Sequence, residues 1–292
     1  MKKHRLLKTI LVLAILFLVV LPAGNVIVYE VLFSRIVPES SDFQPVSESV
    51  PVAIPRDGGR PPIDGSLFAD PEANGSRALI VLSPGIRSTY SSYAPLIDAL
   101  VQSGLSVLAY NYGDSGSVKV SGLPEAARDI NDVLNYLKTS SLSDMPLILM
   151  GHSLGAYASG AVLPEHPEVD GAILISPFDR SSDMLKQSAE RYIGPLVHLF
   201  LPYVRIWERI KFGRFSDASV TDGALSSDCP VVILFGSEDS VITAPYGYEK
   251  LVKSLSSDPE TSIERLENQG HTFDASDKIF RLLLSLTDEM LR

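Results

Sequence analysis

Cysteine is almost absent from the sequence, which holds a single one, Cys229, among 292 residues. An internal disulfide is therefore impossible, and a metal site built on cysteine is not expected. A lone cysteine is compatible with either side of a membrane, so it does not identify the compartment.

Positive charge is also scarce, since the net charge is −10 and part of the positive charge is confined to the start of the chain. Four basic residues, Lys2, Lys3, Arg5 and Lys8, precede the first acidic one, Glu30. Without these four charges the total of −10 becomes −14 for the remainder. The remainder of the chain is acidic enough to repel the phosphate backbone of nucleic acids, and we expect no nucleic-acid partner.

Charge is missing altogether between Thr9 and Tyr29, and Ile10–Leu21 is nearly pure aliphatic sequence. About twenty apolar residues in a helix cross a hydrocarbon core of about 30 Å. The basic residues on the N-terminal side place that end in the cytoplasm. We therefore expect residues 1–34 to be a single-pass membrane anchor, with the rest of the chain on the extracytoplasmic side.

A cleaved signal peptide, followed by secretion, is the alternative to an anchor. The basic start and the apolar run Thr9–Leu21 fit it too. The cleavage site is poor, however, because bulky Leu21 stands where a small residue is preferred before Pro22-Ala23. The apolar character also resumes at Val26–Val28, which favours the anchor. A buried helix of a soluble protein explains the basic cluster less well.

Residues 35–51 are rich in Ser, Pro and Glu and are expected to be a linker, followed by one domain over residues 52–292. In this domain short apolar runs alternate with helical patterns. Strands are predicted at Ala78–Leu82, Leu105–Tyr110, Pro146–Met150, Gly171–Ser176, Val231–Phe235 and Thr261–Leu266. Helices are predicted at Tyr93–Ser103, Pro124–Lys138, Leu154–Leu163, Tyr246–Leu255 and Ser276–Leu291. Continuous apolar strands separated by helices indicate a doubly wound, mostly parallel α/β sheet.

The alternation is interrupted between Ser176 and Val231, where no strand pattern occurs. An apolar and aromatic helical pattern, Tyr192–Phe212, lies in this interval. The interval is too long for one crossover helix, so residues of about 180–226 are expected to form a helical lid insertion.

A tight turn rich in glycine, Gly151-His152-Ser153-Leu154-Gly155, joins a predicted strand to a predicted helix. In this context the pattern G-x-S-x-G is typical of a nucleophile elbow, where the serine hydroxyl is exposed at the end of the sheet. Ser153 is therefore the candidate nucleophile.

A serine hydroxyl needs a base to take its proton, and histidine is the usual one. His271 lies in the loop after the last predicted strand, at the edge of the sheet that holds Ser153. We select it over His152, His166 and His198, and over His4 in the basic leader.

The histidine in turn needs a carboxylate that orients it. Asp239 follows the strand Val231–Phe235 and is the candidate, with Glu238 beside it as a less suitable neighbour. Asp179, after the strand that ends at Ser176, is the second candidate. The order serine, aspartate, histidine along the chain suits an open α/β sheet.

The negatively charged intermediate of acyl transfer needs two N–H donors, an oxyanion hole. The amide of Leu154 is one candidate, and that of Ile86 in the loop after Ala78–Leu82 is the other. Gly85 lets this loop approach closely.

From Val52 onward, about four fifths of the chain resembles the α/β-hydrolase superfamily, in its membrane-anchored esterase, lysophospholipase and serine-peptidase-like group. The resemblance rests on five motifs: Pro84-Gly85, Tyr112-Gly113-Asp114-Ser115-Gly116, Gly151–Gly155, Gly236–Val241 and Gly270-His271. The family usually has His-Gly where this chain has Pro84-Gly85, which leaves open how the loop is ordered without that imidazole.

The expected function is the hydrolysis of carboxylic esters through an acyl-enzyme on Ser153, with lipid or lysophospholipid acyl esters as candidate substrates. No metal and no organic cofactor is expected. A peptidase or thioesterase with the same triad is the alternative, as is a membrane-tethered binding module that has no activity, because fold alone does not decide function.

Overall fold

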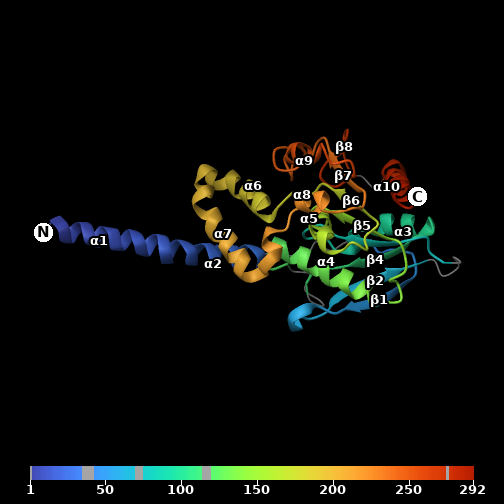
Figure 1. Cartoon of the computed structure of the whole chain (residues 1–292), viewed down its shortest axis with the longest axis horizontal. Coiled ribbons are helices and arrows are strands. Elements are labelled where there is room, and N and C mark those ends of the chain that lie inside the picture. The colour runs from blue at the N-terminus through green and yellow to red at the C-terminus, as the bar shows by residue number, and fades with distance from the viewer. Residues whose placement is uncertain (1, 35–42, 70–74, 114–119, 274–275) are drawn as a thin grey trace.

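A β-sheet forms the centre of the molecule, and a long helix extends from it (Figure 1). The computed structural model describes residues 2–34, 43–69, 75–113, 120–273 and 276–292. Within these ranges the sheet has eight strands in the order β1-β2-β4-β3-β5-β6-β7-β8. They are β1 (Ser49–Ile54), β2 (Ile63–Phe68), β3 (Leu79–Ser83), β4 (Ser106–Tyr110), β5 (Leu147–His152), β6 (Gly171–Ile175), β7 (Val231–Gly236) and β8 (Thr261–Leu266).

Six of these strands, β3 to β8, pair in parallel, which confirms the predicted mostly parallel sheet. Every residue of β3, β4, β5, β6 and β7 is buried, because helices cover both faces. The continuous apolar runs in the sequence follow from this double burial. At the edge, β8 has no fully buried residue, so its pattern is more polar.

The antiparallel strands β1 and β2 are absent from the sequence prediction. β1 begins at Ser49, inside the range 35–51 that the sequence analysis treats as a linker. It lies at the edge of the sheet and is mostly exposed, so it shows no apolar run. β2 is mostly buried, but Asp64, Gly65 and Ser66 interrupt its apolar pattern.

Helices lie on both faces of the sheet, as a doubly wound fold requires. The flanking helices are α3 (Ala94–Gln102), α4 (Leu123–Leu137), α5 (Leu154–Val162), α9 (Tyr248–Leu255) and α10 (Asp277–Met290). The apolar sides of α4, α5 and α9 pack into one core cluster, and those of α3 and α10 pack into the other.

Helices also fill the interval from about 180 to 226, between β6 and β7. They are α6 (Ser181–Ile193), the short turn η5 (Gly194–Leu196), α7 (Val197–Phe212), η6 (Gly213–Asp217) and α8 (Val220–Leu225). The sequence pattern Tyr192–Phe212 predicts one helix, but the structure has two. The break falls at Gly194, whose φ of 53° is left-handed, and at Pro195, which cannot continue a helix.

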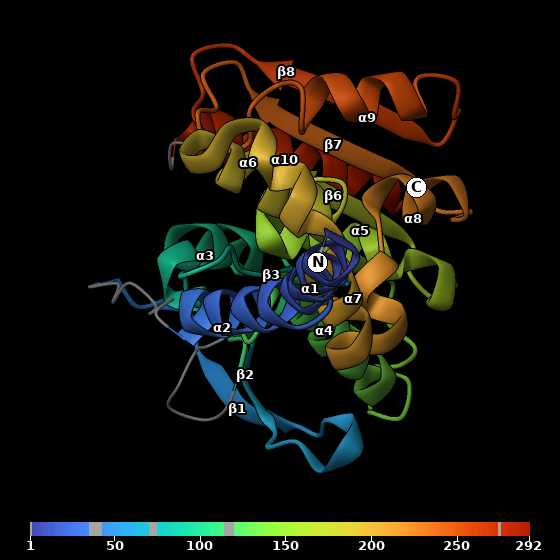
Figure 2. The same ribbon diagram turned by 90° about the vertical axis from the view of Figure 1, so that its left-hand side faces the viewer.

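The N-terminal helix comprises α1 (Lys2–Ile15), a π-helical stretch (Leu16–Val20) and α2 (Leu21–Ser34). Among the described residues one helix, His4–Ser34, is long and apolar enough to cross a membrane, with a mean hydropathy of 2.8. A signal sequence has the same properties. At its C-terminal end Tyr29 and Phe33 are buried against the domain. Figure 2 looks along this helix and shows α7 beside it.

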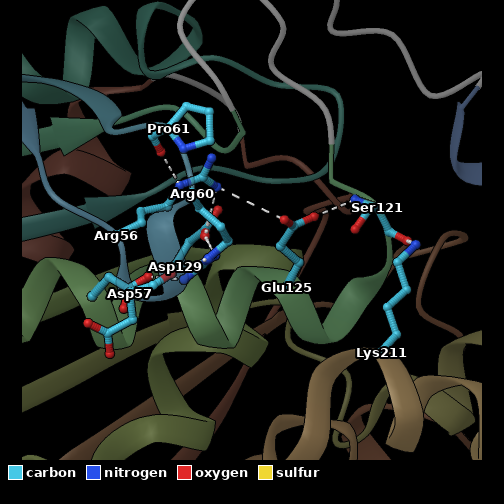
Figure 3. A network of polar contacts seen from close by, with 9 residues as sticks. Arg56, Asp57, Arg60, Pro61, Ser121, Glu125, Asp129 and Lys211 are labelled. Carbon is cyan, nitrogen blue, oxygen red and sulfur yellow. Dashed lines mark hydrogen bonds and ion pairs between the residues drawn. The ribbon is translucent and has the colours of Figure 1, made fainter.

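A buried ionic cluster ties the turn between β1 and β2 to helix α4 (Figure 3). Arg56 and Arg60 donate to Asp129 Oδ1 at 3.2 and 2.9 Å, and Arg60 also pairs with Asp132. Burial raises the pKa of Asp129 to about 7 with help from nearby Glu125, and the two arginines oppose this shift. The cluster therefore depends on both guanidinium groups, since the buried carboxylate costs free energy when it is unpaired.

The network continues from α4 towards the interval 180–226 (Figure 3). The Ser121 amide donates to Glu125 at 2.5 Å, and Lys211 of α7 donates to the Ser121 carbonyl at 2.9 Å. The edge hairpin, α4 and α7 thus form one connected unit.

The substitution Arg60→Ala should destabilise the fold, because it removes one of the two cations that neutralise Asp129. We expect the free energy of unfolding to fall by about 3 kcal/mol, measured by denaturant unfolding of the full chain in detergent. The matched control is Arg77→Ala, which breaks the exposed pair of Arg77 with Asp288 and should cost less than about 1 kcal/mol. Equal losses in the two variants would contradict the role given to the buried cluster.

Candidate active site

Ser153 lies at the sharp turn between β5 and α5, with φ 54° and ψ −113°. Such a conformation is strained for a residue with a side chain, and it turns the hydroxyl outward. The neighbouring glycines are required sterically. A Cβ on Gly151 would lie 2.4 Å from the Gly155 carbonyl oxygen, and one on Gly155 would lie 2.1 Å from the Ser83 oxygen.

The structure brings the three residues selected from the sequence into contact. His271 Nε2 lies 2.9 Å from Ser153 Oγ, and His271 Nδ1 lies 2.8 Å from Asp239 Oδ2. The three side chains follow β5, β7 and β8, and the parallel strands end at the same edge of the sheet. The arrangement has the geometry of a nucleophile, a base and an acid that orients the base.

The Asp239 carboxylate is held in place by more than the histidine. Its Oδ1 accepts hydrogen bonds from the amides of Val241 and Ile242, both at 2.9 Å. Burial alone would raise the pKa of Asp239, but the His271 contact and the two amides outweigh it and hold the pKa below its usual value. The group is therefore a carboxylate at neutral pH. It can only accept, so the proton of this contact is on His271 Nδ1.

The other acids considered in the sequence lie elsewhere. Glu238 is exposed, and its backbone amide donates a hydrogen bond to the Gln269 carbonyl. Asp179 accepts from Lys250 at 3.0 Å and from the Thr221 amide at 2.9 Å. Asp179 is thus paired with these two groups, and no contact between described residues joins it to His271.

The remaining histidines do not bond to Ser153 Oγ either. His166 is buried between Glu168 and Asn131, at 2.8 and 3.2 Å. His198 is exposed on α7, and His4 lies in the N-terminal helix.

The two amides proposed for an oxyanion hole lie on neighbouring segments. Leu154 is the first residue of α5, so its amide has no acceptor within the helix. Ile86 lies in the loop after β3, two residues beyond Pro84. This loop packs closely against the start of α5, because a Cβ on Gly155 would lie only 2.7 Å from the Pro84 carbonyl oxygen. Neither amide makes a backbone hydrogen bond among the residues that the structure describes.

The motif Tyr112–Gly116 lies partly outside the described residues, since these end at residue 113 and resume at 120.

Sequence reasoning missed two residues, His152 and Tyr93, that connect the segments of the site. His152 Nε2 lies 3.0 Å from the His271 carbonyl oxygen, and its Nδ1 lies 2.8 Å from Tyr93 Oη. Tyr93 Oη in turn accepts from the Gly85 amide at 2.9 Å. His152 could have been found from its place beside the nucleophile, whereas Tyr93 had no signal in the sequence.

The positions of the protons in this series of hydrogen bonds follow from the chemistry of the groups that form them. Burial lowers the pKa of His152 to about 4, with a smaller effect of His271, so its ring is neutral at pH 7. A carbonyl oxygen only accepts, so Nε2 of His152 carries the proton and Nδ1 accepts from the Tyr93 hydroxyl. The path therefore runs from the Gly85 amide through Tyr93 and His152 to the backbone of His271.

An apolar cleft adjoins this chain of contacts. Its lining includes Tyr93, Leu96, His152, Ile175 and Phe273, and it extends to α10. In the described residues no group of three or more His, Cys, Asp or Glu side chains is arranged to hold a metal ion.

Comparison with known proteins gives both esterases and peptidases among the similar proteins. A sequence profile described as serine aminopeptidase, S33, matches residues 74–228, just over half of the chain. The match includes Ser153 and ends before Asp239 and His271. The curated relatives include the cutinases est1 and est2 of Thermobifida alba, each 26% identical over 121 residues. These 121 residues are 39% of this chain and about two fifths of either cutinase.

Similar solved structures cover more of the chain. The esterase Pf2001 of Pyrococcus furiosus has a TM-score of 0.63 at 17% identity and covers 88% of this chain and 96% of its own. Est1E of Butyrivibrio proteoclasticus has a TM-score of 0.62 at 16% identity, with 82% and 98% covered. A puromycin-hydrolyzing peptidase of Mycobacterium tuberculosis reaches 0.62 at 17% identity, with 86% and 40% covered.

At such identities these structures show the fold, and the family is given by the sequence profile. The fold, the elbow at Ser153 and the profile agree. The chain belongs to the serine aminopeptidase S33 family and has the fold of the α/β-hydrolases.

Proposed function

We propose that the chain hydrolyses carboxylic esters with Ser153, His271 and Asp239 as its catalytic triad. The observation that carries the proposal is the position of His271, whose two ring nitrogens contact Ser153 Oγ and Asp239 Oδ2 at 2.9 and 2.8 Å. The names of the relatives, cutinases and esterases, favour an ester as the substrate.

The reaction follows from the direction of these hydrogen bonds. Because Nδ1 carries the proton towards Asp239, Nε2 of neutral His271 has the lone pair and accepts the proton of Ser153. The serine oxygen attacks the ester carbonyl, and the amides of Ile86 and Leu154 donate to the oxyanion. His271 then protonates the departing alcohol. A water molecule, activated by the same imidazole, hydrolyses the acyl-enzyme and releases the acid.

The proposed substrate is an ester with an apolar acyl group, such as a lipid or lysophospholipid. The apolar cleft beside His152 supports it, as do the exposed apolar residues of α6 and α7. We further propose that residues 1–34 anchor the enzyme in a membrane, with the domain 52–292 on the extracytoplasmic side and residues 180–226 as a lid. Secretion after cleavage is the alternative, in which case a cut after Ala23 would leave Tyr29 and Phe33 attached to the domain.

A peptidase is the second candidate, because the matching family is described as a serine aminopeptidase and one similar structure is a peptidase. The same triad can cleave an amide, so geometry at Ser153 does not separate the two reactions. Direct turnover of both substrate classes does.

A fluorophosphonate probe should label the wild-type chain and fail to label Ser153→Ala, because the probe captures an activated serine. Equal labelling of both chains would reject the nucleophile, and labelling of neither would favour a binding module without activity.

Turnover is then compared on p-nitrophenyl esters of increasing chain length, an acyl thioester and aminoacyl p-nitroanilides. We expect the highest kcat/KM on esters of medium or long chain. Faster cleavage of the anilides would establish the peptidase instead.

A further inference from the structure

Helix α7 crosses the C-terminal half of the N-terminal helix and bonds to it at two places. Tyr203 Oη donates to the Phe17 carbonyl at 3.0 Å, and Trp207 Nε1 donates to Glu30 Oε1 at 2.9 Å. From Phe17 to Glu30 an α-helix rises by about 20 Å. The contacts of α7 therefore reach from the end of the N-terminal helix to its middle.

The junction of the two helices is packed and not a loose tether. Tyr29 and Phe33 are buried, with their ring centroids 4.6 Å apart. Tyr29 Oη and Ser181 Oγ both donate to the buried carboxylate of Glu208, at 2.9 and 2.7 Å. Lys211 donates to Glu30 at 2.7 Å. These contacts fix α7 and the start of α6 relative to the anchor.

The turn between α6 and α7 exposes a group of large apolar side chains, which we name the lid tip: Tyr192, Ile193, Leu196 and Leu199. Their exposed fractions are 89%, 39%, 62% and 40%. Ile206 and Ile210, which are exposed to 58% and 70%, continue apolar surface along α7. Figure 1 shows α6 and α7 on the side of the domain from which the N-terminal helix extends.

The charges on α7 suit the same environment. The acidic residue of this helix, Glu208, is buried, whereas basic Arg205 and Arg209 are exposed, Arg209 beside Asp217. A helix with exposed apolar residues and neighbouring basic ones is typical of segments that lie in the interface of an anionic membrane.

We propose that the lid tip inserts into the lipid bilayer that the N-terminal helix crosses. The proposal rests on the membrane anchoring proposed above. It commits to lipid as the occupant because the exposed apolar residues lie on helices that bond to the N-terminal helix and the exposed charges of α7 are basic.

Insertion would place the reacting groups next to the membrane, because α6 also bonds to the loop that holds Asp239. Gln187 donates to the Val241 carbonyl at 2.6 Å and accepts from the Thr243 amide at 2.9 Å. Arg191 donates to the Ser240 carbonyl at 3.0 Å.

Quenching by lipid-borne nitroxide tests this contact directly. The background is the full chain with Ser153→Ala and Cys229→Ser, so that a single new cysteine can be labelled with a polarity-sensitive fluorophore and no activity is needed. The probe at Leu196→Cys, in vesicles containing phosphatidylglycerol, should lose most of its fluorescence when nitroxide lipid is present. The matched control is Val50→Cys on β1, which is exposed to 65% and should keep its fluorescence.

A third probe separates the failure of the lid contact from the failure of the anchor. Leu18→Cys, in the N-terminal helix and exposed to 77%, should be quenched if that helix spans the bilayer. Quenching at Leu18 without quenching at Leu196 would overturn the lid proposal alone, and no quenching at Leu18 would overturn the anchor as well. A blue-shifted but unquenched probe at Leu196 would show that protein covers the tip, which also contradicts the proposal.

A separate observation, the chain of contacts from Gly85 to His271, carries a second inference. We infer that His152 and Tyr93 are positioning residues, which hold the turn of Ile86 and the loop of His271 in place around Ser153. Tyr93 stands where it can order the Pro84-Gly85 turn, which lacks the imidazole usual in the family. Neither side chain contacts Ser153 Oγ, so both act through the backbone of other residues.

The variants Tyr93→Phe and His152→Leu should lower kcat on a soluble short-chain ester by about 10- to 100-fold and change KM little, because displaced reacting groups lose transition-state contacts. His152→Gln can donate to the His271 carbonyl and accept from Tyr93, so it should recover most of the lost kcat. Tyr90→Phe is the control, since the Tyr90 hydroxyl contacts Ser66 at 3.3 Å. An unchanged kcat with a lower Tm would show a structural role only, and no recovery with glutamine would contradict the hydrogen-bonded path.

Discussion

The hydrogen bond between His271 Nε2 and Ser153 Oγ joins two loops that are far apart in the sequence, and the proposed chemistry depends on it. The parallel sheet makes this contact available, because β5, β6, β7 and β8 are neighbours and end at one edge. Ser153 follows β5, Asp239 follows β7 and His271 follows β8. The buried apolar strands thus determine where the polar groups meet.

Several contacts around this bond limit the movement of the loops that carry it. The Val241 and Ile242 amides hold Asp239, while His152 holds the backbone of His271. Helix α6 bonds to the loop after Asp239, and α7 packs against the N-terminal helix. A path of direct contacts therefore leads from the N-terminal helix through α7 and α6 to the loop that holds Asp239.

The sequence predicted the parts of the molecule whose residues carry a local pattern. Fully buried strands such as β5 and β7 are apolar runs, and the glycines at 151 and 155 mark a turn that no Cβ fits. The edge strand β1 escaped prediction because exposure removes the apolar pattern, and β2 escaped because Asp64, Gly65 and Ser66 interrupt that pattern. Tyr93 escaped because its contacts join distant segments, which one sequence does not display, whereas His152 was signalled by its place beside Ser153 but was weighed only as a base.

In the proposed mechanism Ser153 and His271 act as one unit, and the most direct test is kcat/KM of the single and double variants on a p-nitrophenyl ester. Once either partner of such a pair is lost, the other has little left to contribute. We therefore expect Ser153→Ala, His271→Ala and the double variant to have nearly the same low kcat/KM. Losses that multiply in the double variant would show that the two side chains work independently, which would contradict the account.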